Sequence, residues 1–166
     1  AIEAVEDGGE RVSSTVLRQQ LAEGDLEGAA RVLGRRYAIS GKVVHGKQLG
    51  RKLGYPTANL RLAGKRPALT GIYATWVHGI GPEPRASVSS LGTRPTVAGV
   101  EPLLEAHVFH FDGDLYGRRI EVEFVAKLRD EEKFDDLPAL VHQMDLDSAQ
   151  ARRALRLDME QRGAVA

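Results

Sequence analysis

Apolar positions between residues 12 and 34 recur every three or four residues, which is the spacing of one face of an α-helix. Two short helices are predicted here, separated at Gly24, because glycine commonly ends a helix and Asp25 can cap the next one. Ser13 or Ser14 is expected to cap the first helix. The residues expected to face inward are Val16, Leu17, Leu21, Leu26, Ala29, Ala30 and Leu33.

Beyond Arg36 apolar and polar residues alternate, which is typical of strands with one face on a core. The Asp112-Gly113 turn predicts that the last two strands form a hairpin. Six short strands without intervening helices favour an antiparallel β-barrel, so the predicted fold is mainly β with flanking N- and C-terminal helices. The expected strands lie near 37–44, 57–62, 71–78, 85–91, 103–111 and 118–126.

After the last predicted strand the helical spacing returns. Asp135 or Asp136 is expected to cap a first C-terminal helix, and a second helix is predicted over about 148–159. The apolar stripe of the first helix consists of Leu137, Leu140, Val141 and Met144.

The composition limits the classes of function. The 166 residues suit one domain with a short appendage, and 23 basic residues balance 23 acidic ones. A neutral chain with 5% aromatic residues has little overall field to attract a nucleic acid. The absence of cysteine excludes disulfides and thiolate metal sites, and the five histidines lack zinc-site spacing. No apolar run approaches the ~20 residues that span a bilayer, so we expect a cytoplasmic protein without a membrane partner.

Residues 50–59 carry the richest candidate chemistry. Gly50 and Gly54 let backbone amides approach an anion, while Arg51 and Lys52 supply positive charge. These residues could equally form a plain surface hairpin, because glycine and proline punctuate turns.

Thr57 and Asn59 follow Pro56, which pushes Tyr55 into an extended conformation and stiffens the entry into the next strand. Residues two apart on a strand share a face, so Thr57 and Asn59 would present a hydroxyl and an amide oxygen together. These are hard ligands that suit Mg²⁺ beside phosphate oxygens.

Glu105 is the candidate general base. Its predicted strand places it on the same side as Leu103, His107, Phe109 and Phe111. A carboxylate among apolar neighbours has a raised pKa, which makes it a better base near neutral pH. The alternative is a solvated carboxylate on the rim of the barrel.

The run at 50–59 resembles the motif of the riboflavin kinase family, whose members phosphorylate riboflavin with ATP to give FMN. This chain has Ser90 where many bacterial members carry asparagine, although serine at this position also occurs in the wider family. Together the similar segments cover roughly residues 35–155. Five further blocks follow in the family's order, at 71–74, 90–97, 104–107, 114–117 and 128–131.

The resemblance implies a riboflavin kinase barrel with C-terminal helices over 36–160, with ATP, Mg²⁺ and riboflavin as its ligands. It also implies that Glu105 takes the proton of the substrate hydroxyl and that Thr57 and Asn59 hold the metal. The ATP-binding residues expected on this basis are Gly46, Lys47, Gly50, Lys52, Gly54, Tyr55, Pro56, Thr57 and Asn59. The residues expected to flank the flavin are Tyr116, Leu128, Arg129 and Phe134. Phe134 could equally pin the C-terminal helix to the barrel.

Ser13-Ser14-Thr15 with Arg18 resembles the last motif of the adenylyltransferase half of bifunctional bacterial riboflavin kinase/FAD synthetases. Residues 1–35 are therefore expected to be the helical tail of that half and a linker, and the sequence looks like a cut within a longer chain. The expected partner is the adenylyltransferase domain of the parent chain, and this part alone should not make FAD.

Two other classes of function remain open. An OB-like barrel could bind single-stranded nucleic acid, which would require basic stripes with interleaved aromatics and a strong salt dependence. The chain could also be a flavin-binding module without catalytic activity, in which case it would bind riboflavin and form no FMN.

Overall fold

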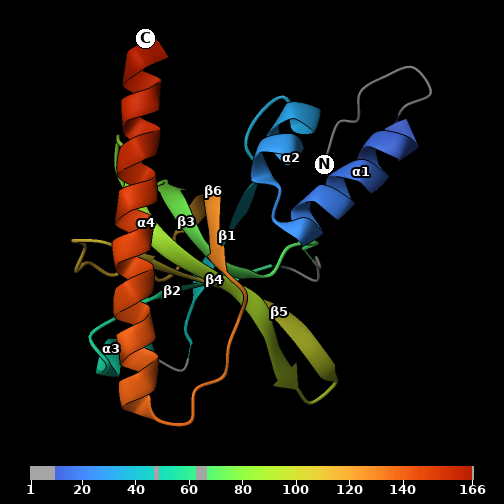
Figure 1. The fold of residues 1–166 in the computed structure, drawn as a ribbon. Coiled ribbons are helices and arrows are strands. Elements are labelled where there is room, and N and C mark those ends of the chain that lie inside the picture. Colours follow the sequence, from blue (N-terminus) through green and yellow to red (C-terminus); the bar gives the residue numbers. More distant parts are fainter. Residues whose placement is uncertain (1–9, 47–48, 63–66, 166) are drawn as a thin grey trace.

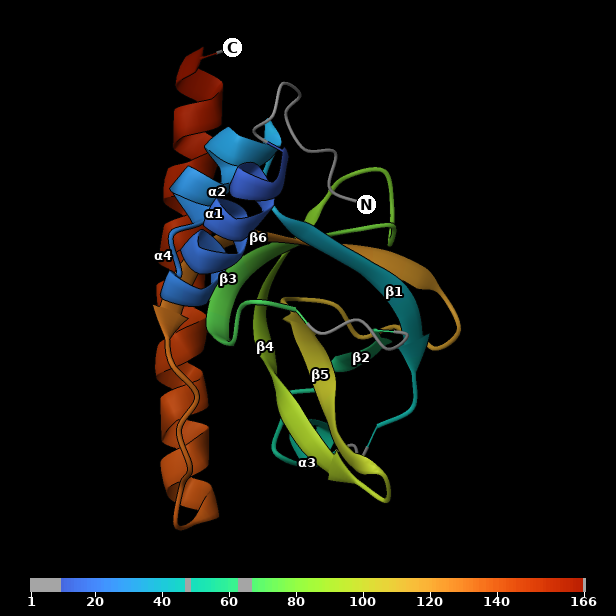
Figure 2. The same cartoon turned by 90° about the vertical axis from the view of Figure 1, so that its right-hand side faces the viewer.

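Six antiparallel strands close into a barrel in the computed structural model, which describes residues 10–46, 49–62 and 67–165 (Figure 1, Figure 2). The order around the barrel is β1-β2-β5-β4-β3-β6. The predicted six-stranded antiparallel barrel with helices at both ends is confirmed. The strands are β1 (Ala38–Val44), β2 (Ala58–Arg61), β3 (Gly71–His78), β4 (Arg85–Thr96), β5 (Gly99–Val108) and β6 (Arg119–Arg129). The helices are α1 (Glu10–Glu23), α2 (Leu26–Leu33), α3 (Leu49–Lys52) and α4 (Leu137–Val165).

The predicted hairpin of the last two strands is wrong. β6 pairs with β1 and β3, whereas β5 pairs with β2 and β4. The turn residues belong instead to a longer connection between β5 and β6, which passes beside β1. In this connection the Asp114 side chain accepts a hydrogen bond from the Tyr116 amide, and the Gly117 amide donates to the Val43 carbonyl at 2.9 Å.

The β4–β5 hairpin is longer than the alternation predicts. Its ladder runs from Ser87↔Val108 to Thr96↔Gly99 and extends away from the barrel (Figure 2). Gly92 and Pro95 interrupt the apolar pattern in this part of β4, so the sequence suggested an earlier end.

Helices α1 and α2 pack on one end of the barrel (Figure 2). The predicted cap of α2 is confirmed, because Asp25 Oδ1 accepts a hydrogen bond from the Gly28 amide at 3.0 Å. The predicted serine cap of α1 is wrong: Ser13 and Ser14 lie inside a helix that starts at Glu10. Val16 also faces solvent, contrary to expectation. The helix residues buried with the barrel core are Leu17, Leu21, Leu26 and Ala29.

The barrel interior is filled by side chains that alternate along the strands. Tyr73 and Phe124 are fully buried and meet edge to face, with ring centroids 5.2 Å apart. Thr75 brings a hydroxyl into this apolar space, where it is hydrogen-bonded to Ser87 at 2.6 Å and to Ser89 at 2.8 Å. These mutual bonds offset the cost of burying the hydroxyl groups.

The C-terminal helix α4 is a single helix of 29 residues, so the prediction of two helices is wrong. Asp136 caps it, since its Oδ1 accepts a hydrogen bond from the Ala139 amide at 2.8 Å. Ser148, where the second helix was expected to start, lies buried in the middle of α4 beside the buried Asp147. The helix packs along β3, β4 and β6. Within the described residues, no helix has the length and apolarity to cross a membrane.

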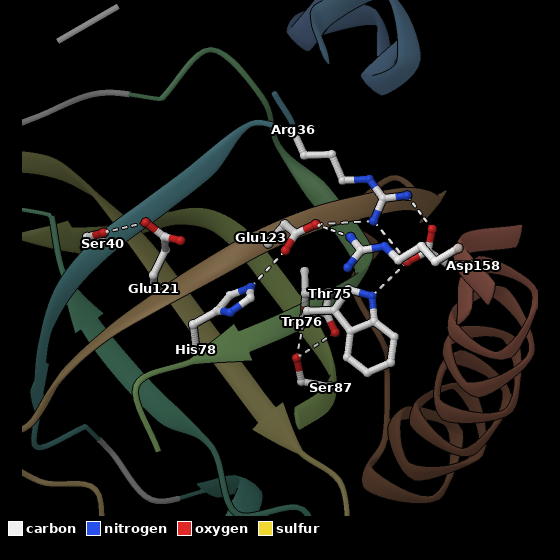
Figure 3. Close-up of polar contacts among 10 residues, drawn as sticks. Arg36, Ser40, Thr75, Trp76, His78, Ser87, Glu121, Glu123 and Asp158 are labelled. Carbon is white, nitrogen blue, oxygen red and sulfur yellow. Dashed lines mark hydrogen bonds and ion pairs between the residues drawn. The ribbon is translucent and has the colours of Figure 1, made fainter. Parts of the chain in front are cut away.

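A polar cluster ties α4 to the barrel and to the segment after α2 (Figure 3). Asp158 of α4 is hydrogen-bonded to Arg36 and accepts a 2.9 Å bond from the indole nitrogen of Trp76. Glu123 of β6 lies 3.1 Å from Arg36 and 2.7 Å from His78. These contacts fix α4 against the barrel wall, and residues of its N-terminal half line the cavity described next.

Candidate active site

Two cavities meet where β2 begins. The α4 cavity, of about 420 Å³, lies between the barrel wall and α4. The β1 cavity, of about 340 Å³, lies beside the end of β1 and the connection that precedes β6. Thr57 and Asn59 line both cavities, so they form a shared wall between them.

Thr57, Asn59 and Glu105 converge as the sequence predicted. Asn59 lies directly opposite Glu105 in the β2–β5 ladder. The Thr57 hydroxyl donates to Glu105 Oε2 at 3.5 Å. Paired residues on neighbouring antiparallel strands have Cβ atoms about 5 Å apart, which explains how distant parts of the sequence bring three oxygen-bearing side chains together.

The environment of Glu105 favours a role in proton transfer. Burial raises the pKa of Glu105, while the Thr57 hydrogen bond and the charge of Arg94 act in the opposite direction. Leu103 and His107 line the α4 cavity with it, as predicted for that face of β5. Phe111 does not share this face, because the strand ends at Val108 and Phe111 packs towards the barrel interior.

Residues 49–55, which we call the glycine-rich loop, fold as the short helix α3 followed by a turn. The Gly50 carbonyl accepts a bond from the Tyr55 amide at 2.6 Å, and a side chain at position 50 would collide with the Tyr55 carbonyl. Gly54 has a positive φ of 86°, which favours glycine. Across the shared wall, Gly46 lies so close to the Asn59 amide that a side chain there would displace it.

The predicted ATP-binding residues are divided between the two cavities. Gly50 and Tyr55 line the α4 cavity, whereas Gly46 and Pro56 line the β1 cavity. Lys52 and Gly54 are exposed and line neither of these two cavities, and Arg51 lines the β1 cavity instead. Lys47 lies outside the described residues.

Two of the four predicted flavin residues lie in the α4 cavity, namely Arg129 and Phe134. The Arg129 guanidinium lies 5.7 Å from the centre of the Phe134 ring and forms two 2.8 Å hydrogen bonds with Asp147 of α4. Asp147 raises the pKa of Arg129, which therefore keeps its charge and a fixed orientation.

The other two predicted flavin residues lie elsewhere. Leu128 packs against the apolar cluster under α4 that contains Trp76 and Leu155, because neighbouring residues on a strand point to opposite faces. Tyr116 lines the β1 cavity, where its ring stacks on His45 with centroids 3.7 Å apart. The connection that carries Tyr116 turns towards β1, which separates this residue from the other three.

Helix α4 contributes functional side chains that the sequence did not predict. Asp145 accepts a hydrogen bond from the Tyr55 hydroxyl, which links the glycine-rich loop to the helix. Ser148 lines the α4 cavity with its hydroxyl buried and without a hydrogen-bond partner among the described residues. Three polar residues at 145, 147 and 148 interrupt the apolar stripe of the helix, and this was the available signal.

Arg94 lies on β4, in the part of the strand that extends beyond the barrel. It lines the α4 cavity, and its guanidinium is paired with Glu101 across the β4–β5 hairpin. This position near Glu105 lets the charge of Arg94 act on the carboxylate.

Comparisons with known proteins identify relatives of this arrangement. A family model described as flavokinase (riboflavin kinase) matches residues 33–155. The bifunctional riboflavin kinase/FMN adenylyltransferase of Escherichia coli K12 is 46% identical over 146 residues, which cover 88% of this chain and 47% of the relative. The enzyme of the same name from Pseudomonas fluorescens is 46% identical over 92% of this chain and 49% of the relative. The chain thus spans about half the length of the curated relatives it matches.

Two solved structures are also similar. A Streptococcus pneumoniae crystal structure described as a macrolide-efflux protein superposes with a TM-score of 0.76 and 36% identity, covering 90% of this chain and 49% of that one. The riboflavin kinase of Trypanosoma brucei gives a TM-score of 0.53 and 26% identity, covering 72% of this chain and 76% of that one.

Proposed function

The chain belongs to the riboflavin kinase family, and we propose that it transfers the γ-phosphate of ATP to the 5′-hydroxyl of riboflavin, giving FMN and ADP. The observation that carries this proposal is the position of Thr57, Asn59 and Glu105. The first two line both cavities, and Glu105 lies beside them, so substrates bound on either side would meet at these side chains.

We propose the α4 cavity as the riboflavin site. Its volume suits a small ligand, and Phe134, Leu140 and Met144 supply apolar surface for a planar ring system. Arg129 and the buried Ser148 hydroxyl, both on the cavity wall, could hydrogen-bond to the polar edge of the flavin. The ribityl chain would then run towards Glu105.

We propose the β1 cavity as the nucleotide site. The exposed Tyr116 ring, stacked on His45, offers a flat aromatic surface for a base. Gly46 lets the backbone approach a ligand closely, and Arg51 adds a positive charge for phosphate. The triphosphate would end at Thr57.

The chemistry requires charge neutralisation and a proton acceptor. Thr57 and Asn59 would hold Mg²⁺ through hard oxygen ligands, and the bound metal would neutralise charge on the phosphates. No group of three metal-binding His, Asp or Glu side chains converges within the described residues, so the phosphates would supply much of the metal's negative ligand charge. Glu105 would accept the proton of the riboflavin 5′-hydroxyl. The oxygen of that hydroxyl would bond to the γ-phosphorus while the bond between the γ-phosphorus and the ADP oxygen breaks.

We further propose an adenylyltransferase half as the partner, because the relatives are named as bifunctional enzymes. Residues 1–35 would then join the two halves, and the kinase unit would span residues 36–160. The buried contacts of α1 and α2 with the barrel core would hold this junction rigid.

The test is to incubate the protein with riboflavin, ATP and Mg²⁺ and to separate the flavins by chromatography. We expect FMN and equimolar ADP. Riboflavin binding without FMN would instead support the non-catalytic module, and salt-dependent binding of a labelled oligonucleotide would support the nucleic-acid barrel.

A further inference from the structure

We propose that His107 is a positioning residue for phosphoryl transfer, which holds Thr57 in place through a hydrogen bond to the carbonyl of Pro56. This inference rests on the proposed kinase function and adds a residue that does not touch the reacting atoms. The distance between His107 Nδ1 and the Pro56 oxygen is 2.7 Å.

The hydrogen bond stands where the strand ladder stops. The last pair of the described β2–β5 ladder is Ala58↔Ala106, immediately before which the chain passes through Pro56 and Thr57. Proline has no amide hydrogen and cannot donate to a ladder. The carbonyl oxygen is thus the only backbone group of Pro56 that can hydrogen-bond, and the His107 side chain supplies its donor.

The chemistry of the contact fixes the state of the ring. A carbonyl oxygen only accepts, so Nδ1 of His107 must carry the proton. Burial lowers the pKa of His107, which favours a neutral ring at pH 7. The ring lies edge to face with Tyr55 and Phe109, at centroid distances of 5.0 and 5.6 Å, and these contacts limit its rotation.

The same strand thus carries both the proposed base, Glu105, and the positioning residue, His107. Glu105 and His107 are two residues apart on one face of β5. Glu105 meets the Thr57 hydroxyl, and His107 holds the residue before it. A misplacement of Thr57 by about 1 Å would be enough to lower turnover by about 10²-fold.

The test compares two substitutions of similar size. His107→Leu removes the donor but keeps an apolar side chain between Tyr55 and Phe109. His107→Asn keeps an N–H close to the position of Nδ1. We expect His107→Leu to lower kcat by about 10- to 100-fold and to raise the Mg²⁺ concentration for half-saturation, with little change in riboflavin affinity. His107→Asn should recover most of the activity.

Two results would overturn the proposal. One is wild-type turnover in His107→Leu. The other is an equal loss in both variants that follows a parallel fall in Tm, because that would show a packing role only.

A second measurement does not depend on activity. Nitrogen-15 NMR of the imidazoles, with His107 assigned by the loss of its signals in His107→Asn, should show the Nδ1–H tautomer in the free protein. The Nε2–H tautomer would contradict the hydrogen bond from His107 to the Pro56 carbonyl. If the wild-type protein makes no FMN while the Nδ1–H tautomer is present, the kinase assignment fails and the Pro56 contact stands.

Discussion

A methyl group at Gly46 should damage catalysis while leaving the fold intact. In Gly46→Ala the added carbon would overlap the side-chain amide of Asn59. The overlap requires the amide to move by roughly 1 Å, and Asn59, which is only 8% exposed but lines both cavities, has room to move into them. The Asn59 oxygen would then leave the position proposed for the metal ligand.

The expected magnitude follows from that displacement. Shifting a positioned group by about 1 Å costs about 10²-fold in rate, or about 2.7 kcal/mol of transition-state stabilisation. The conformational cost of alanine at this position should remain below about 1 kcal/mol, because the flexible end of a side chain gives way. We therefore expect a large loss of kcat/KM for ATP with a small change in Tm.

The assay is FMN formation at varied ATP and Mg²⁺, with Tm measured for each variant. Gly81→Ala is the matched control, since an added carbon there meets no atom within 4 Å. Wild-type ATP and Mg²⁺ dependence in Gly46→Ala would refute the proposed role of Asn59.

Three further perturbations test other parts of the account. Glu105 must be ionised to accept a proton, so activity should fall as the pH drops through its raised pKa. Arg94→Ala removes a positive charge that lowers this pKa, so the acidic limb of the kcat–pH profile should move to higher pH. An unmoved limb would contradict the assignment of Glu105 as the base. Tyr116→Ala should raise the KM for ATP by about 2- to 10-fold and leave that for riboflavin unchanged; the reverse pattern would return Tyr116 to the flavin site. Asp158→Asn should lower the free energy of unfolding by about 2 kcal/mol at pH 7. Because Arg36 lowers the pKa of folded Asp158, this stabilisation is present above the unfolded pKa of about 3.9 and is lost as the pH falls through the folded value. If urea denaturation gave wild type and Asp158→Asn the same dependence of unfolding free energy on pH, the assigned role of Asp158 would be wrong.

The barrel could be predicted because strand alternation is a local signal. All six strands were found, although the ends of β4 and β5 were missed where Gly92 and Pro95 break the pattern. The order of the strands could not be predicted, because closing a barrel depends on contacts between distant segments. The Asp112-Gly113 turn is a strong local signal, but β6, which follows it, pairs with β1 and β3 and not with β5.

The meeting of Thr57, Asn59 and Glu105 was expected from the resemblance to the riboflavin kinase family, whereas the division into two cavities was not. Tyr116 illustrates the limit, since its block resembles the family's flavin region while the fold places its ring against His45. The role of α4 was also hidden, because the sequence suggested two C-terminal helices and the partner of Asp147, Arg129, lies on a different element.

The most direct test of the central claim compares wild-type protein with Glu105→Gln in one experiment that follows both riboflavin binding and FMN formation. Glutamine keeps the shape of the side chain but cannot accept the hydroxyl proton. We expect nearly unchanged riboflavin affinity with a loss of turnover of about 10²- to 10⁴-fold. Wild-type turnover in Glu105→Gln would contradict it.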